Sequence, residues 1–254
     1  MIKLKLSKYH SCENTFLITM LQKNKDYSQL AINLCSKEKY DTDGLLILNT
    51  DPIEVFFYNK DGTEANMCGN GLNSMMHYCY DKFKIYKYLK FKTKAGEFEC
   101  EMLKKDPFYS CVNLGMGNYY KNIIREKVFL IDKEYEVSMF ELGVLHAIIL
   151  VDDLKNINAN EVFENNFFDK KANINFVKII NNNTIEIITY EKGVGITKAC
   201  GTGAGASSYI MHKYYGLDSH IDVLTLGGIL KVEISDNIYL KADSVFVMDL
   251  EEKE

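Results

Sequence analysis

Residues 199–207, ACGTGAGAS, place one cysteine directly before alternating glycines and other small residues. Residues 67–75, MCGNGLNSM, repeat the arrangement. Helical periodicity begins after each cysteine and runs over 69–83 and 201–215. The sequence therefore predicts two helices. Each starts immediately after a cysteine and has glycines in its first turn.

The two cysteines divide the chain into similar halves. Cys68 and Cys200 are 132 positions apart (200 − 68) in a chain of 254 residues. Short strand-like segments between polar turns precede and follow each expected helix, and a third helix is expected over 26–35. This long period indicates an internal duplication, with two α+β lobes built alike. A site between such lobes would receive one cysteine from each.

Composition restricts the function classes. The chain is 47% hydrophobic and 26% charged with a net charge of −5, which argues against nucleic acid or an anionic membrane as partner. The start, MIKLKLSKYH, has no apolar run long enough for a signal peptide, and no segment approaches a membrane span. We expect a cytoplasmic protein. Seven cysteines without CxxC or zinc-ligand spacing predict no metal, and no motif predicts an organic cofactor.

The start of a helix suits anions. Its first backbone N–H groups have no intrahelical partner, and the helix dipole adds partial positive charge there. Glycine lets a ligand approach this backbone closely. The turns at Gly69 and Asn70, and at Gly201 and Thr202, are therefore expected to bind an anion such as a carboxylate or a phosphate. A cysteine at the same place has its thiolate stabilised and becomes a general base or acid.

Two such thiols on opposite sides of one carboxylate suggest a specific reaction. One thiolate removes the α-proton, and the opposite thiol returns a proton to the other face, which gives the mirror-image centre. A single CGxG is more often a buried cysteine at a tight turn. Two copies, each opening a helix in a duplicated half, favour catalysis.

At these residues the chain resembles the diaminopimelate epimerase family of amino-acid racemases, which use no pyridoxal phosphate. Residues 57–71, FYNKDGTEANMCGNG, are similar to the family's first cysteine motif, and residues 190–204, YEKGVGITKACGTGA, to its second. The resemblance covers nearly the whole chain. It implies two pseudo-symmetric lobes, each a curved, mostly antiparallel sheet wrapped around a central helix. The final strand would return to the first lobe, so that 1–116 with 243–254 carries Cys68, and 117–242 carries Cys200.

The resemblance also implies residue roles. Cys68 and Cys200 would be the acid–base pair, with His146 (in VLHAI) as partner of Cys68 and Glu191 (in YEKG) as partner of Cys200. By themselves His146 would be a core histidine and Glu191 a solvated charge. Substrate contacts are expected at Asn14, Asn59, Gly69, Asn70, Val144, Asn173, Lys192, Gly201 and Thr202. A homodimer is expected only through the resemblance.

The chain departs from the family where the far carboxylate of diaminopimelate would bind. Lys192 replaces an arginine, Val144 replaces an asparagine beside Leu145 in place of proline, and Asn73 replaces an arginine. A valine cannot donate a hydrogen bond, and an unpaired buried charge is costly. We therefore expect a racemase for a single-ended amino acid, with histidine as the leading substrate. The alternatives are an epimerase of diaminopimelate or lanthionine, and a non-catalytic amino-acid-binding protein on the same fold.

Overall fold

The computed structural model describes residues 3–85, 87–115, 123–130, 133–155, 157–168 and 171–253. The chain forms two compact units. The N-terminal unit comprises Met1–Val112 and Ala242–Glu254, and the C-terminal unit comprises Asn113–Lys241. The boundary expected at 116 and 117 lies outside the described residues, so that position stays a prediction.

In its described residues the N-terminal unit has two helices, and all but one of its strands lie before residue 116. Its helices are α1 (Tyr27–Leu34) and α2 (Gly69–Phe83), and its strands are β1 (Lys3–Ser11), β2 (Asn14–Met20), β3 (Gly44–Thr50), β4 (Ile53–Asn59), β5 (Glu64–Ala65), β6 (Tyr88–Thr93), β7 (Gly96–Lys105), β8 (Phe108–Gly115) and β18 (Val245–Lys253). The chain leaves this unit within β8.

The C-terminal unit has its own set of elements. Its helices are α3 (Ala159–Phe163), the short 3-10 helix η2 (Asn166–Phe168) and α4 (Gly201–Tyr215), and its strands are β9 (Ile124–Leu130), β10 (Lys133–Leu142), β11 (Val144–Leu150), β12 (Asn173–Asn181), β13 (Thr184–Glu191), β14 (Gly195–Ile196), β15 (His220–Thr225), β16 (Gly228–Ile234) and β17 (Ile238–Asp243). The chain returns to the N-terminal unit at the end of β17.

The strand pairings repeat from one unit to the other. In the N-terminal unit β18, β1 and β2 pair antiparallel, β2 and β3 parallel, β3 and β4 antiparallel, β4 and β6 parallel, and β6 and β7 antiparallel. In the C-terminal unit the same sequence of directions links β9, β10, β11, β12, β13, β15 and β16. This correspondence confirms the predicted duplication.

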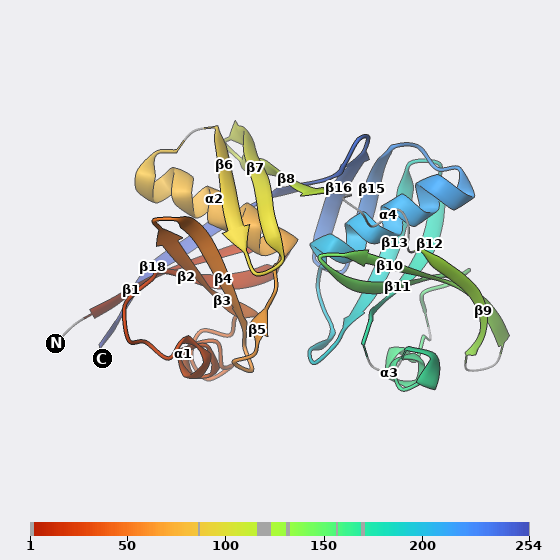
Figure 1. The fold of residues 1–254 in the computed structure, drawn as a ribbon, viewed down its shortest axis with the longest axis horizontal. Coiled ribbons are helices and arrows are strands. Elements are labelled where there is room, and N and C mark those ends of the chain that lie inside the picture. Colours follow the sequence, from red (N-terminus) through yellow and green to blue (C-terminus); the bar gives the residue numbers. More distant parts are fainter. Residues whose placement is uncertain are drawn as a thin grey trace. The chain divides into compact units, whose positions relative to one another are not determined.

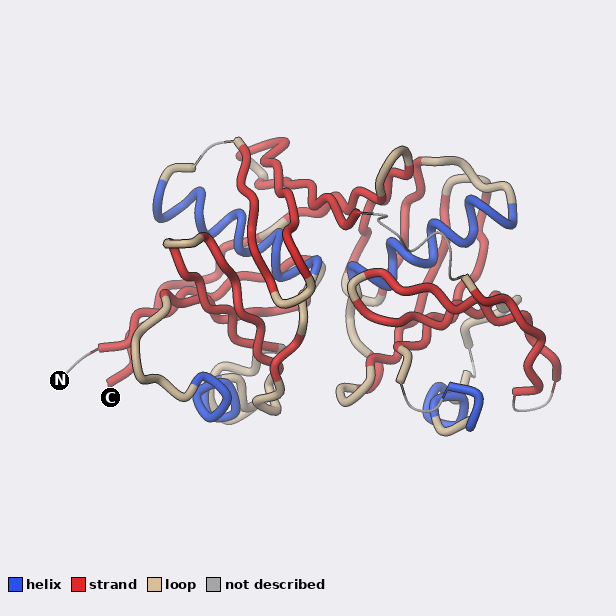
Figure 2. Tube along the Cα trace, viewed as in Figure 1, coloured by secondary structure: helices blue, strands red, loops and turns tan. Residues whose placement is uncertain are grey.

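A long buried helix lies within the curved sheet of each unit (Figures 1 and 2). Helix α2 contacts β1, β2, β7 and β18, while α4 contacts β10, β11, β12, β13, β15 and β16. The first eleven residues of each helix, 69–79 in α2 and 201–211 in α4, are all buried. In α4 small residues permit this, because Gly, Ala and Ser dominate its first eight positions. In α2 larger apolar residues are buried together with polar ones, and Asn73 is hydrogen-bonded to Ser110. The predicted α+β fold of two pseudo-symmetric lobes is confirmed.

The opposite face of each sheet is covered by a short helix. In the N-terminal unit, Leu17, Leu45 and Ile47 pack with Ala31 and Leu34 of α1. In the C-terminal unit, side chains of β11 and β12 pack in the same way on α3. Since side chains alternate between the faces of a strand, the neighbouring residues point toward the long helix instead.

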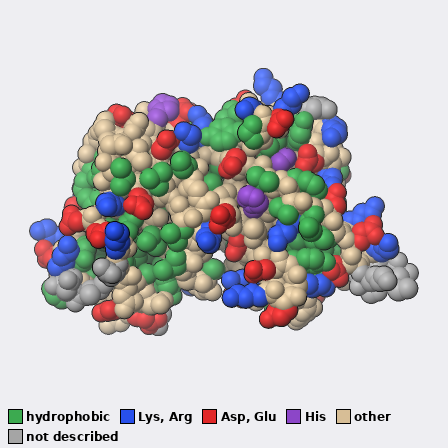
Figure 3. All heavy atoms as spheres, turned by 180° about the vertical axis from the view of Figure 1, so that it is seen from behind, with side chains coloured by type: hydrophobic (Ala, Val, Ile, Leu, Met, Phe, Trp, Pro, Cys, Tyr) green, Lys and Arg blue, Asp and Glu red, His purple; other side chains and the backbone are tan. Residues whose placement is uncertain are grey.

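Two observations concern the charge of the surface and the length of the helices. On the face drawn in Figure 3, basic and acidic side chains are interspersed and form no region of one sign. None of the helices in the described part of the chain has both the length and the apolar character that crossing a membrane requires.

Candidate functional site

Cys68 caps the start of α2. Its backbone is extended (φ −144°, ψ 122°), and the Gly71 N–H donates to its Sγ over 3.4 Å. The thiol thus takes the position that serine or aspartate usually occupies at a helix N-cap. A Cβ on Gly71 would lie 2.9 Å from Phe57 Cε1, so the glycine is needed for close packing. Cys68 is half-buried, and the next residues, Gly69 and Asn70, are buried.

A carboxylate fixes the amide beside Cys68. The Cys68 Sγ lies 3.9 Å from Asn14 Oδ1, while Asn14 Nδ2 donates to Asp43 Oδ2 over 3.1 Å. The same carboxylate oxygen accepts from Thr15 N at 2.7 Å and from Thr15 Oγ1 at 3.1 Å. Because a carboxylate can only accept, the amino group of Asn14 must face Asp43 and its carbonyl oxygen must face the sulfur.

Cys200 caps α4 in the same way. Its backbone is extended (φ −120°, ψ 109°), and the Gly203 N–H donates to its Sγ over 3.4 Å. The Thr202 Oγ1 lies 3.6 Å from the same sulfur. A Cβ on Gly203 would lie only 2.4 Å from Asn175 Oδ1, so this turn accepts no larger residue without displacing Asn175. Cys200 is 7% exposed and Thr202 6% exposed.

His146 connects to Cys200 through Thr202. The third residue of β11, His146, is fully buried, and its Nε2 lies 3.0 Å from Thr202 Oγ1. Its Nδ1 lies 3.1 Å from Asn175 Nδ2. Burial lowers the pKa of His146 to about 3, because the charged imidazolium would lose its hydration. His146 is therefore a neutral imidazole at physiological pH.

Asn175 has a fixed orientation. Its Nδ2 donates to the backbone carbonyl of Ala147 over 3.2 Å, and its Oδ1 accepts from Thr189 Oγ1 over 2.9 Å. A carbonyl oxygen accepts only, so the amino group must lie on the side of Ala147 and His146. Asn175 is fully buried, and Thr189 is 3% exposed.

Glu191 and Asn59 occupy equivalent places in the two units. Each is the last residue of its strand, β13 or β4, and each lies nine positions before its cysteine (200 − 191 and 68 − 59). Glu191 Oε1 accepts from Thr197 Oγ1 over 2.7 Å, and Asn59 Nδ2 donates to Thr63 Oγ1 over 3.0 Å. Both side chains are half-buried, so each unit presents one polar strand end.

The remaining predicted substrate contacts lie in the C-terminal unit. Asn173, at the start of β12, accepts the Lys192 N–H on its Oδ1 over 3.0 Å. The Lys192 residue is exposed, and Val144, at the start of β11, is half-buried. In the N-terminal unit Asn73, which stands where the family has an arginine, is buried and its Oδ1 accepts from Ser110 Oγ over 2.7 Å. Gly201 and Thr202 form the buried first turn of α4.

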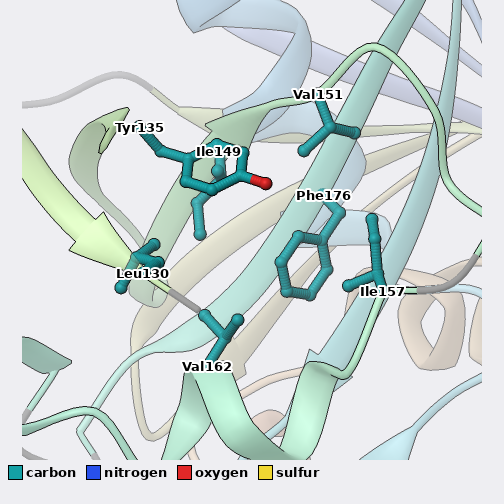
Figure 4. A pocket seen from close by; sticks show the side chains of 7 residues that line it. All are labelled: Leu130, Tyr135, Ile149, Val151, Ile157, Val162 and Phe176. Atoms are coloured by element: carbon teal, nitrogen blue, oxygen red, sulfur yellow. The ribbon is translucent and has the colours of Figure 1, made fainter. Parts of the chain in front are cut away.

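The C-terminal unit also contains a small apolar cavity of about 20 Å³ (Figure 4). Its walls are Leu130, Tyr135, Ile149, Val151, Ile157, Val162 and Phe176. Phe176 and Ile149 belong to the cluster packed on α3, whereas Asn175 and His146 face α4. The cavity therefore lies on the other side of the sheet from Cys200.

The sequence interpretation missed Asp43, Asn175, Thr189 and Thr197. Asn175 sits between Ile174 and Phe176 in a run of buried strand residues. A polar residue in the middle of such a run needs a hydrogen-bond partner, and that signal was present in the sequence. The sequence did not reveal which residues are its partners, because His146 and Thr189 lie on other strands.

Comparison with known proteins gives a consistent result. The family model described as diaminopimelate epimerase matches residues 138–247. The chain is 31% identical to the diaminopimelate epimerase of Clostridium perfringens over 97% of this chain and 98% of that protein. It is 35% identical to the diaminopimelate epimerase of Campylobacter lari over 82% of each chain.

A solved structure shares the fold. The hydroxyproline epimerase of Agrobacterium vitis, solved with bound trans-4-hydroxy-L-proline, superposes with a TM-score of 0.73 at 9% identity. The match covers 98% of this chain and 92% of that one. At this identity the likeness establishes the fold alone.

Proposed function

Because this chain belongs to the diaminopimelate epimerase family, we propose that it inverts an α-carbon of diaminopimelate by acid–base chemistry at two cysteines. The protein is an isomerase of the amino-acid epimerase and racemase class. The choice of substrate is supported by the full-length similarity to diaminopimelate epimerases, which favours diaminopimelate over histidine.

The proposed chemistry uses the two thiols in opposite roles. One cysteine, as thiolate, takes the α-proton of the substrate. The other, as thiol, donates a proton to the opposite face of the same carbon. Cys68 and Cys200 support this assignment because each sits at a helix N-cap, where a backbone N–H and the helix dipole stabilise a thiolate.

The carbanion intermediate also needs stabilisation. General base catalysis contributes about 10²–10⁴-fold per group. The rest must come from donors fixed on the developing enediolate oxygens. The first turns of α2 and α4, at Gly69 and Asn70 and at Gly201 and Thr202, support this role because they are buried and glycine-rich. Asn14, Asn59 and Asn173 are proposed as polar contacts to the substrate.

Two further side chains are proposed as partners of the thiols. Glu191 is proposed as the partner of Cys200, and His146 as a partner of Cys68 during turnover. The hydrogen bond from Thr197 holds the Glu191 carboxylate in one place. Both ring nitrogens of His146 are hydrogen-bonded within the C-terminal unit, so pairing with Cys68 requires that one of these bonds be released during turnover.

Histidine remains the second candidate substrate because of Val144 and Lys192. Val144 is half-buried and offers no hydrogen bond to a distant carboxylate. Lys192 presents a point charge, not the bidentate fork of an arginine. A shorter, single-ended amino acid would not need either contact.

Deuterium incorporation distinguishes these substrates. Purified, reduced enzyme is incubated in deuterated water with diaminopimelate, lanthionine or histidine, and α-deuterium is read by NMR. We expect exchange with diaminopimelate and none in the variant lacking both thiols. Exchange with histidine alone would replace the proposed substrate. Absence of exchange with every amino acid would favour a binding protein.

Replacing either cysteine tests the two-thiol scheme. Cys68→Ser and Cys200→Ser are each expected to lower racemisation by about 10²–10⁴-fold or more, because a hydroxyl is much less acidic than a thiol. Serine keeps the helix cap, so circular dichroism should remain unchanged. Near-normal turnover in either variant would refute the scheme.

The double variant Val144→Asn with Lys192→Arg tests specificity. Asparagine and arginine both donate hydrogen bonds to a carboxylate, so kcat/KM for diaminopimelate is expected to rise by about tenfold or more. The ratio of diaminopimelate to histidine turnover is measured for the wild type, both single variants and the double variant. An unchanged ratio would mean that these positions do not set specificity.

We also propose a cytoplasmic homodimer. Reduced thiols are maintained in that compartment. Val245, Phe246, Val247 and Met248 of β18 are 41–46% exposed, a run of hydrophobic surface that a second copy would cover. Light scattering should give a dimer for the wild type and a monomer for Val247→Lys. Ile229→Lys, at another exposed hydrophobic residue, is the control and should stay dimeric.

A further inference from the structure

The hydrogen bonds around Cys200 run in one direction. Asn175 Nδ2 must donate to His146 Nδ1, because its amino group is fixed by the Ala147 carbonyl. The neutral imidazole then carries its hydrogen on Nε2. Nε2–H donates to Thr202 Oγ1, 3.0 Å away.

The threonine hydroxyl continues this direction. With Nε2–H as a donor, Thr202 Oγ1 acts as acceptor on that side. Among the described residues its other neighbour is Cys200 Sγ at 3.6 Å, so the hydroxyl hydrogen points to the sulfur. The Gly203 N–H donates to the same sulfur. Two donors aimed at one sulfur favour the thiolate over the thiol.

The side chain beside Cys68 has the opposite polarity, while the backbone donor is the same, because the Gly71 N–H donates to Cys68 as the Gly203 N–H donates to Cys200. The Asp43 carboxylate holds the Asn14 amino group, so the Asn14 carbonyl oxygen faces the sulfur at 3.9 Å. A carbonyl oxygen can only accept a hydrogen bond. It therefore favours the protonated thiol, whose S–H can donate to it.

The two units differ at the strand position that holds the imidazole. The third residue of β11 is His146, which pairs with Asn173, whereas the third residue of β2 is Phe16, which pairs with Gly44. The N-terminal unit thus has a phenyl ring where the C-terminal unit has its imidazole. In the described residues, the chain from imidazole to hydroxyl to sulfur leads to Cys200.

We infer that the resting enzyme holds negative charge on Cys200 and a proton on Cys68, and that Asn175 and Asp43 are the positioning residues that set this difference. The inference rests on the proposed two-thiol function. In the first turnover Cys200 takes the α-proton and Cys68 gives up its own. The product therefore leaves Cys200 as thiol and Cys68 as thiolate. Exchange of one proton with water at each sulfur restores the resting state.

Other ionisable groups lie near each sulfur. On the side of Cys200 they are His146 on β11, Glu191 at the end of β13 and Lys198 two residues earlier in the chain. On the side of Cys68 the nearest carboxylate in the hydrogen-bonded set is Asp43. The test therefore compares variants that change one hydrogen bond and no charge with variants that change a charge.

The pH dependence of alkylation measures each thiol separately. The protein without substrate is treated with iodoacetamide from pH 5 to 10, and each cysteine peptide is quantified by mass spectrometry. The pH at half-maximal rate does not depend on accessibility, which differs between Cys68 and Cys200. We expect the midpoint of Cys200 to lie below that of Cys68. Equal midpoints, or the reverse order, would overturn the inference.

Single variants then test the positioning residues. Thr202→Val should raise the Cys200 midpoint by about one pH unit, the equivalent of one hydrogen bond to a charged group, and leave Cys68 unchanged. Thr202→Ser keeps the hydroxyl and should keep the wild-type alkylation midpoint of Cys200. Asp43→Asn frees the Asn14 amide to rotate, so the Cys68 midpoint should fall while Cys200 stays constant. Unfolding would instead change both thiols together. A Cys200 midpoint that does not respond to Thr202→Val would refute the proposal that the Thr202 hydroxyl stabilises the Cys200 thiolate.

The imidazole tautomer provides a measurement that does not involve the thiols. Nitrogen-15 NMR of histidine-labelled protein, assigned by comparison with His146→Gln, should show His146 protonated on Nε2 and unprotonated on Nδ1. A proton on Nδ1 would contradict the direction inferred for the hydrogen bonds that lead from Asn175 to Cys200. Both measurements are made without substrate, so they stand even if the proposed racemisation is not observed. A wrong substrate and a wrong proton arrangement therefore give different results.

Discussion

At the residue scale, the candidate site depends on buried polar side chains with fixed orientations. Asn175 contacts His146, Ala147 and Thr189, and its oxygen lies against the glycine turn that begins α4. A buried amide without partners would cost about 1–3 kcal/mol, so these contacts hold one rotamer. The orientation of a single amide decides which nitrogen of His146 carries the hydrogen.

His146 should affect the pH dependence of stability. Its pKa is lowered to about 3 in the folded protein, whereas an unfolded histidine titrates near 6.5. The unfolded state therefore binds the extra proton between these values. The stabilisation is complete above pH 6.5 and is lost as pH falls toward 3. We expect the free energy of unfolding of His146→Gln to fall less steeply below pH 6, by up to about 1.4 kcal/mol per pH unit.

Urea unfolding at several pH values between 4 and 7 provides the measurement. Buried His77, whose pKa is also lowered by burial while Asp81 opposes the effect, contributes equally to both proteins. Identical slopes for wild type and His146→Gln would show that His146 is charged in the folded state.

At the element scale, each sheet serves two helices with different tasks. The long helices α2 and α4 place a cysteine at a helix start, while the short helices α1 and α3 close the opposite face with apolar side chains. Asn175 and Phe176, adjacent in β12, point to these two faces. Stability and chemistry are therefore separated by the alternation of side chains along one strand.

Phe176→Ala tests this separation. Phe176 is 2% exposed and lines the apolar cavity, so truncation should destabilise the protein by about 3–5 kcal/mol. Racemisation per folded molecule should stay within about twofold of wild type at low temperature, because the change lies on the face away from Cys200. Denaturant unfolding and initial rates are measured together. Phe129→Ala, at a side chain that is 68% exposed, should change stability by less than about 0.5 kcal/mol. A loss of activity with intact folding would show that the two faces are coupled.

At the scale of the whole molecule, the chain ends belong to one unit. β18 pairs with β1 from Lys3 opposite Lys253 to His10 opposite Val245. Leu250 packs on the apolar cluster under α1, and Asp249 accepts from Ser7 Oγ over 2.6 Å. The N-terminal unit is therefore completed only when the end of the chain has been made.

Deleting residues 245–254 should destabilise one unit selectively. The loss exposes Leu4 and Leu6, which are now buried, and removes the strand that pairs with β1. Hydrogen exchange followed by mass spectrometry should show reduced protection in Met1–Val112 and wild-type protection in Asn113–Lys241. Asp249→Asn, which weakens the ion pair with Lys82 and keeps the strand, should change protection little. Equal loss in both units would mean that they fold as one cooperative body.

Local patterns predict the two long helices better than they predict an exposed strand with a charged sequence. The helices over 69–83 and 201–215 follow from their small and apolar residues, and Asp26 caps α1 as its sequence position indicates. The sequence of β9, IREKVFL, carries no clear strand signal. Its residues are mostly exposed, so it lacks the hydrophobic alternation of a half-buried strand. Pairing with β10 decides its conformation.

The sequence by itself determined the duplication, the two cysteine-capped helices and the family. Local patterns suffice for these, since a glycine turn, a helix start and a repeat are each written in adjacent residues. Only the tertiary structure decided which polar groups meet. His146 and Thr202 are 56 positions apart, and Asn175 and His146 are 29 apart. Strand register and helix placement bring them within hydrogen-bonding distance, and hydrogen bonds depend on direction as well as distance. The polarity around each sulfur is therefore a property of the fold.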